Sequence, residues 1–194
     1  MKHTILIALL LPFTAFAADE FTLDPTHTYP NFSISHLGFS VMHGRFNESS
    51  GTVVMDRDGG ASSVKVTVKT ASIDTGMDKR DDHLRKPEFL DVAKFPEMMF
   101  ESTKVSFTGK DTAKVEGKLT LHGVTKPLTL DVTKIVCNVH PMKKNYVCGF
   151  DAKASLKRSD FGVAGYLPAI GDEVEIRISA EGERKEKTGG PPRG

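Results

Sequence analysis

Residues 118–133 read Lys-Leu-Thr-Leu-His-Gly-Val-Thr-Lys-Pro-Leu-Thr-Leu-Asp-Val-Thr, and apolar positions alternate with polar ones through this stretch. Leu119 and Leu121 fall on one side of the first run, and Leu128, Leu130 and Val132 fall on one side of the second. Successive side chains of a β-strand point to opposite faces, so each run has one apolar and one polar face. The stretch therefore predicts two amphipathic strands connected across residues 122–127.

The same alternation recurs outward from this stretch. Clear runs lie at 64–68 (within an expected strand at 62–70), 150–156 and 174–180, and further strands are expected at 21–23, 32–36, 45–56 and 100–107. The phase slips by one between Phe100 and Val105, which predicts a bulge near 102–104. About eight to ten short strands favour an antiparallel barrel or sandwich over a fold that alternates strands and helices.

One segment departs from the strand pattern. Residues 78–92 have helical composition, and Pro87 can open a second short helical turn over 88–92 because its missing N–H costs nothing there. The fold class is therefore all-β with one short helical insertion. The interior of such a fold is filled either by its own side chains or by a ligand, and periodicity alone leaves both alternatives open.

The first 17 residues predict a cleaved signal peptide. Lys2 precedes the apolar run 5–11, and Ala15-Phe16-Ala17 has the small-x-small pattern of a cleavage site. The run is too short for a membrane-spanning helix, so we expect export without a stable membrane anchor. Cleavage lowers the Lys and Arg count from 26 to 25, equal to the 25 Asp and Glu. A neutral chain without Trp does not fit a nucleic-acid partner.

Two cysteines, Cys137 and Cys148, lie beside expected strands, on either side of a polar connection. An even cysteine count in an exported chain predicts a disulfide, here one that bridges a hairpin. The alternative is a pair of redox-active thiols, but the spacing is not C-x-x-C.

The sequence offers little support for a metal or hydrolytic site. The histidines at 27, 36, 43, 83 and 122 are not close in sequence to one another or to Cys or Glu clusters, so no metal site is expected. There is no G-x-S-x-G motif, and Asp81-Asp82-His83 on a charged helix is typical of a solvated face.

Four segments together resemble the YceI-like, polyisoprenoid-binding family of bacterial periplasmic proteins. They are Leu23–Thr28 with Phe32–Gly38, Asp82–Arg85 with Glu88–Asp91 and Phe95-Pro96, Gly117–Pro127, and Arg158–Gly162. They stand in the family's order and span nearly all of the chain after the signal peptide. The cysteine pair and the Gly/Pro-rich tail depart from the family's common pattern.

The resemblance implies an antiparallel, lipocalin-like eight-stranded barrel over residues 18–183, with an elongated apolar channel. The tail at 184–194 has no apolar residue to bury, so its composition predicts disorder. It implies a periplasmic carrier that sequesters an amphiphilic isoprenoid, of quinone or polyprenyl type, or a similar long-chain lipid, with no required cofactor and no covalent chemistry. A homodimer is left open. The expected channel residues are Phe32, Ile34, Phe100, Leu119, Leu121, Leu128, Leu130, Leu156, Phe161, Ile176 and Ile178.

Three polar residues are candidates for contact with the ligand head group. His36 shares a face with Phe32 and Ile34, and a neutral imidazole there could hydrogen-bond a carbonyl. Arg85 and Arg158 could contact a phosphate, although an Arg beside an Asp is more often a local structural clamp. Two other functions remain open: an enzyme of quinone or lipid turnover that uses His36, and a stress-response module with a packed core.

Overall fold

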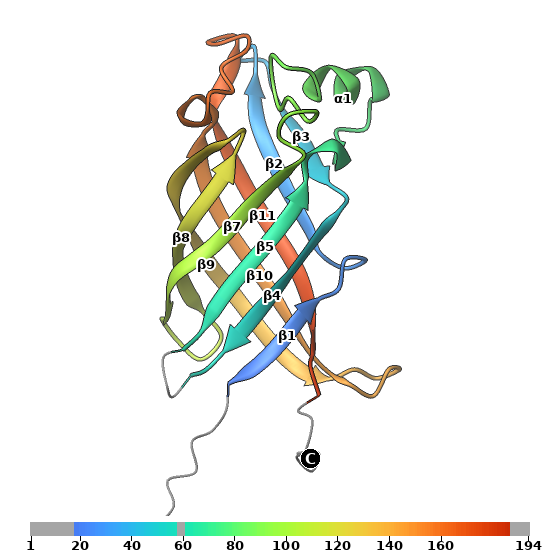
Figure 1. Ribbon diagram of the computed structural model, residues 1–194, viewed down its shortest axis with the longest axis vertical. Helices are drawn as coiled ribbons and strands as arrows, with labels where there is room; N and C mark the ends of the chain where they lie inside the picture. Colours follow the sequence, from blue (N-terminus) through green and yellow to red (C-terminus); the bar gives the residue numbers. More distant parts are fainter. Residues whose placement is uncertain (1–17, 58–60, 187–194) are drawn as a thin grey trace, which may run out of the picture.

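The computed structural model describes residues 18–57 and 61–186, which form a closed antiparallel β-barrel with one short helix (Figure 1). The helix is α1 (Asp78–Leu84), and single 3₁₀ turns lie at Thr70–Ser72 and Arg158–Phe161. The strands are β1 (Asp19–Leu23), β2 (Tyr29–His36), β3 (Ser40–Phe46), β4 (Ser49–Met55), β5 (Ser63–Lys69), β6 (Ile73–Asp74), β7 (Glu97–Phe107), β8 (Ala113–Leu121), β9 (Val124–Val139), β10 (Tyr146–Lys157) and β11 (Ile170–Arg184).

The barrel closes because β1 pairs with both β4 and β11. The closed ring runs β1-β4-β5-β7-β8-β9-β10-β11, which confirms the expected eight-stranded antiparallel barrel. The three remaining strands extend the wall at one end: β2 continues along the edge of β11, β3 pairs with β2, and β6 pairs with β3. At three places around the barrel, two short strands together therefore occupy the place of one long strand. These pairs are β1 with β2, β3 with β4, and β5 with β6.

The single strand expected over 45–56 is wrong, because the chain turns at Asn47 and Glu48. Asn47 donates its side-chain amide to Asp74 Oδ2 at 3.1 Å, and the Glu48 N–H donates to Ser72 Oγ at 3.1 Å. These bonds hold the turn, so the segment before it pairs with β2 and β6, and the segment after it pairs with β1 and β5.

The helical insertion is shorter than expected. α1 ends at Leu84, and the second helical turn predicted over 88–92 is instead a series of non-helical turns. The Leu90 N–H donates to Leu84 O and the Val92 N–H donates to Arg85 O, with Asp91 at a positive φ of 44°. This path buries Phe89 and Leu90. The free energy gained by burying these apolar side chains outweighs the free energy that a second regular helical turn would contribute.

Two bulges set which side chains face inward. The predicted slip in β7 is confirmed, since the register with β8 shifts between Ser102 and Lys104. A second shift lies between β9 and β10, where Asp151 and Ala152 pair with Lys134 and Val132 and leave Thr133 unpaired. The alternation of residues along β9 does not indicate this bulge, which brings both Val132 and Ile135 to the inner face.

The predicted disulfide is present and joins directly paired residues of β9 and β10. Cys137 and Cys148 face one another across the two strands with their Cα atoms 4.0 Å apart. Cys148 is fully buried and packs with Phe21, Leu23 and Val53 in an apolar cluster at the end of the barrel near the termini. The bridge therefore fastens the hairpin that borders this cluster.

Strand β11 extends one residue beyond the barrel boundary expected at residue 183. Arg184 is the last residue of β11 and pairs with Phe21, and Lys185 donates its backbone N–H to Glu20 O at 2.8 Å. The barrel seam requires these two residues, so they do not belong to the tail. The signal peptide at 1–17, the turn expected at 58–60 and the tail at 187–194 lie outside the described residues.

Candidate functional site

The barrel encloses an apolar cavity of about 610 Å³. This volume lies within the roughly 300–1,000 Å³ typical of small-molecule sites, so the fully packed core left open by the sequence is not the structure observed. All eight positions of the ring contribute to its wall. The wall includes ten of the expected channel residues, Phe32, Ile34, Phe100, Leu119, Leu121, Leu128, Leu130, Leu156, Ile176 and Ile178.

Two of the phenyl rings in the cavity wall lie against glycines of neighbouring strands, which helps to keep the lumen open. Phe32 pairs with Gly44, and a Cβ on Gly44 would be 2.4 Å from the Phe32 ring. In the same way, a Cβ on Gly117 would be 2.5 Å from the ring of Phe100. A glycine lets a ring fold down onto the strand backbone, so these two phenyl groups cover the wall instead of crossing the lumen.

The cavity is elongated along the barrel. Its wall includes Ile170 at one end of β11 and Ala180 near the other. Ten residue steps at about 3.3 Å correspond to about 33 Å along the strand and, at a tilt of about 40°, to about 25 Å along the barrel axis. The end near the termini is filled by the cluster around Phe21, whereas the wall at the α1 end includes the exposed residues Leu37 and Tyr166. The α1 end is therefore the mouth.

His36, one of the three head-group candidates, lines the cavity at the mouth. It is the last residue of β2 and pairs with Ile170 of β11. No hydrogen bond to its ring is found among residues 18–57 and 61–186. Its two ring nitrogens are therefore available to a ligand, as a donor and an acceptor in the neutral form.

Arg158 also lines the cavity, but its guanidinium holds the loop that follows it. The Nε, Nη1 and Nη2 atoms donate to the carbonyl oxygens of Gly171, Val163 and Ile170 at 2.8–3.0 Å. The side chain is buried, which lowers the pKa of Arg158 from its ordinary value. This geometry is that of the structural clamp considered for Arg158, here directed at backbone carbonyls rather than at Asp160.

Arg85 and Phe161 do not contribute to the cavity wall. Arg85 donates to Ala71 O and Ile73 O, each at 2.9 Å, and forms an ion pair with Asp82, so it fastens α1 to the neighbouring strand ends. Phe161 is 2 % exposed and packs in the main core cluster behind the wall. The structure thus places one of the three head-group candidates, His36, at the mouth with an uncommitted side chain.

An aromatic group that was not expected from the sequence covers part of the mouth. The rings of Phe89 and Tyr166 stack at 5.8 Å, and His83 approaches both edge-on at 5.1 and 5.9 Å. His83, Phe89 and Tyr166 all line the cavity, as does Arg80. No local pattern indicates this group, because Tyr166 is far from His83 and Phe89 in the chain and His83 lies in a charged helix.

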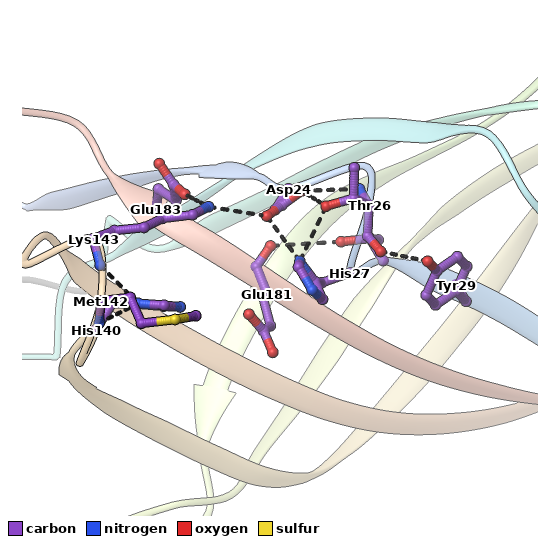
Figure 2. A network of polar contacts seen from close by, with 10 residues as sticks. Asp24, Thr26, His27, Tyr29, His140, Met142, Lys143, Glu181 and Glu183 are labelled. Carbon is purple, nitrogen blue, oxygen red and sulfur yellow. Dashed lines mark hydrogen bonds and ion pairs between the residues drawn. The ribbon is translucent and has the colours of Figure 1, made fainter.

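A polar network surrounds Asp24 near the opposite end (Figure 2). Asp24 Oδ1 accepts hydrogen bonds from the Thr26 N–H and hydroxyl at 2.8 and 2.6 Å, and His27 Nδ1 lies 3.0 Å from Asp24 Oδ2. Lys143 of the β9–β10 turn bridges Asp24 and Glu183 of β11. The network thereby ties three chain segments together beside the filled end of the barrel.

Stability should depend on pH through Asp24 and His27. Hydrogen bonding by Thr26 and then His27 holds the pKa of Asp24 well below its usual range, and the bond to Asp24 raises the pKa of His27. The Asp24 contribution is present above the unfolded value near 3.9 and is lost as pH falls through the folded pKa. The His27 contribution is complete below about 6.5 and is lost as pH rises through its folded pKa.

Asp24→Asn should therefore lower the Tm most between about pH 4 and 6.5, where both groups contribute. Thermal unfolding followed by circular dichroism across this range measures the difference. Asp111→Asn, in an exposed turn, is the matched control. An equal effect of the two substitutions at every pH would contradict the assignment.

Among the described residues, no three His, Cys, Asp or Glu side chains are arranged to hold a metal ion. The one α-helix of this part of the chain is far too short and polar to traverse a lipid bilayer.

Comparisons with known proteins agree with the geometry. Residues 21–182 match the model of the YceI-like domain. A UPF0312 protein of Pseudomonas aeruginosa is 42 % identical over 180 residues, which cover 92 % of this chain and 93 % of the relative. The crystal structure of Burkholderia cenocepacia BcnA has 23 % identity and a TM-score of 0.74, covering 82 % of this chain and 98 % of that one.

A polyisoprenoid-binding domain from Saccharophagus degradans, implicated in plant cell wall breakdown, has the same fold at a TM-score of 0.63. Its identity to this chain is 17 %, with coverage of 85 % of this chain and 98 % of that structure.

Proposed function

This chain belongs to the YceI-like domain family, and from that premise we propose that it is a carrier that sequesters an amphiphilic isoprenoid in its barrel cavity. The ligand class is a quinone or polyprenyl compound, or a similar long-chain lipid, and it binds without covalent chemistry. The observation that carries this proposal is the elongated cavity of about 610 Å³ with a wall of aliphatic and phenyl side chains. The isoprenoid named for the Saccharophagus degradans domain supports the choice of ligand class.

The wall chemistry favours a hydrocarbon chain. Each 100 Å² of apolar ligand surface buried there contributes about 2.5 kcal/mol before the cost of ordering the ligand. A slender chain that follows the cavity could therefore bind tightly without a hydrogen bond along most of its length. His36 at the mouth then offers a single polar contact to a carbonyl or hydroxyl head group.

We place this carrier in the periplasm, reached through cleavage of residues 1–17. The small-x-small pattern at 15–17 and the disulfide between Cys137 and Cys148 both support an exported, oxidising location. Cell fractionation with mass measurement of the intact protein tests this, and the expected mature chain begins at Ala18 with one disulfide.

Organic extraction of the purified protein, followed by mass spectrometry, tests the carrier function directly. We expect at least one long-chain isoprenoid or related lipid, bound in a fixed ratio to protein. The absence of any extracted lipid, together with no uptake of an added quinone, would overturn the proposal. A turnover of the bound lipid that disappears in His36→Ala while occupancy is retained would instead indicate an enzyme.

A further inference from the structure

Exposed apolar side chains gather at the mouth of the cavity. The β2–β3 turn presents Leu37 and Phe39, which are 50 % and 91 % exposed, and the loop before β11 presents Tyr166 and Leu167, which are 61 % and 36 % exposed. We name these four residues the mouth rim. An exposed Leu or Phe is ordinary when isolated, but several around one opening form a surface that needs an explanation.

The two segments of the mouth rim are held together. The Leu37 N–H donates to Ala169 O at 2.8 Å, and His36 pairs with Ile170. Tyr166 is in turn stacked on Phe89 beside α1. The rim is thus a single surface at the α1 end of the barrel, and two of its members, Leu37 and Tyr166, also line the cavity.

The rim segments carry no charge. Residues 37–39 and 162–170 include no Asp, Glu, Lys or Arg, although 26 % of the whole chain is charged. A tyrosine at the edge of such a surface combines an apolar ring with a hydroxyl that can stay in water, as is common at membrane interfaces. The surface matches the border between lipid head groups and hydrocarbon better than it matches water.

Backbone conformation gives an independent argument. Leu37 and Tyr166 adopt left-handed conformations, with φ of 53° and 60°. Glycine, asparagine and aspartate adopt this region most easily, and a bulky residue there is uncommon and costly. Both rim turns therefore hold a large apolar side chain where a small polar residue would favour folding, which points to a role outside the fold.

We propose that the mouth rim docks on the surface of a phospholipid bilayer, so that a lipid passes between the membrane and the cavity without crossing water. This inference rests on the proposed carrier function, because the bilayer is the reservoir of such a ligand. The apolar surface is continuous from Leu37 and Tyr166 at the rim into the cavity wall, which gives a hydrocarbon chain an unbroken path.

Flotation of the purified protein with vesicles of phosphatidylethanolamine and phosphatidylglycerol tests the docking. Phe39→Asp should lower the vesicle-bound fraction about tenfold or more, because the exposed phenyl group that would enter the bilayer is replaced by a charge. Met142→Asp is the matched control, because Met142 is 81 % exposed in the β9–β10 turn at the opposite end. Equal binding by Phe39→Asp and wild type, or an equal loss in Met142→Asp, would overturn the proposal.

A second variant separates docking from folding. Leu37→Asn relieves the backbone strain of a leucine in the left-handed conformation. The Tm of this variant should therefore equal or exceed that of wild type, while vesicle binding falls. A lower Tm with unchanged vesicle binding would show that Leu37 has only a structural role, and would contradict the inference.

Lipid uptake distinguishes this proposal from the carrier function. A fluorescent isoprenoid alcohol added from solvent should enter Phe39→Asp as readily as wild type, because Phe39 does not line the cavity. The same probe delivered in vesicles should enter the variant about tenfold more slowly. Failure of uptake by every route, with flotation intact, would refute the carrier but not the docking. Dimerisation that is lost in Phe39→Asp, without vesicle binding by wild type, would refute the docking.

Discussion

Ile176→Glu is expected to weaken lipid binding by at least about a hundredfold. Ile176 lies on the cavity wall in the middle of β11, paired with Phe32 of β2 and Ala154 of β10. The two residues paired with position 176 are apolar, so they offer a carboxylate no ion pair. Burying an unpaired charge under a hydrocarbon chain costs at least about 3 kcal/mol. In the empty protein the same carboxylate can be hydrated by water in the cavity, so binding should suffer more than folding.

The matched control is Arg177→Glu, one residue further along the same strand. Arg177 is exposed on the outer face, so this variant introduces the same side chain without approaching the cavity. Fluorescence titration with a quinone measures the two affinities, and circular dichroism verifies that both variants fold. Similar affinities for both variants would mean that the ligand does not occupy the cavity.

An uncharged substitution tests the same cavity by filling part of its volume. Ala152 lines the lumen, paired with Ile178, and Ala152→Phe would place a ring where the ligand chain is expected to lie. Because the added ring enters free space, its cost in stability should be below the 1–3 kcal/mol typical of overpacked cores. Lipid binding should nevertheless fall. Unchanged binding by Ala152→Phe would count against the carrier function as strongly as unchanged binding by Ile176→Glu.

Phe21→Ala is expected to be the most destabilising single substitution that we predict, by about 3–5 kcal/mol. The Phe21 side chain is fully buried, and its ring lies 6.5 Å from Tyr146 and 6.4 Å from Phe150. Its backbone is paired with Val53 on one side and Arg184 on the other, so the residue sits at the seam that closes the barrel. At about 2–4 °C per kcal/mol for a chain of this size, the Tm should fall by about 6–20 °C.

Thr22→Ala is the control for this prediction. Thr22 occupies the same seam but is exposed on the outer face, so its truncation should change stability by no more than about 0.5 kcal/mol. Thermal unfolding of the two variants measures the contrast. If Phe21→Ala melted within a degree or two of Thr22→Ala, the cluster at the filled end would not be a principal source of stability.

The wall of the cavity could be predicted from the sequence to a large extent. The alternation of apolar and polar residues along a strand is a local property, so the inward positions of β8, β9 and β11 follow directly from their apolar residues. The register shift in β7 and the disulfide between Cys137 and Cys148 could also be predicted, because each concerns residues close in sequence.

The polar residues of the mouth were less predictable. Arg85 and Arg158 were candidates for contact with the ligand head group. In the structure, their guanidinium groups instead donate hydrogen bonds to backbone carbonyl oxygens at 2.8–3.0 Å. Those carbonyls belong to strand ends and loops whose positions depend on barrel closure. The grouping of His83 with Phe89 and Tyr166 depends on the same closure, and no local pattern in the chain indicates it.

Amphipathic strands with an apolar inner face follow from the amino-acid sequence alone, because strand periodicity is encoded residue by residue. The hollow interior that is open at one end depends on the tertiary fold. That outcome depends on Phe32 meeting Gly44, and on Phe100 lying against Gly117. Both contacts join different strands, so the free space between side chains is a property of register and closure rather than of composition.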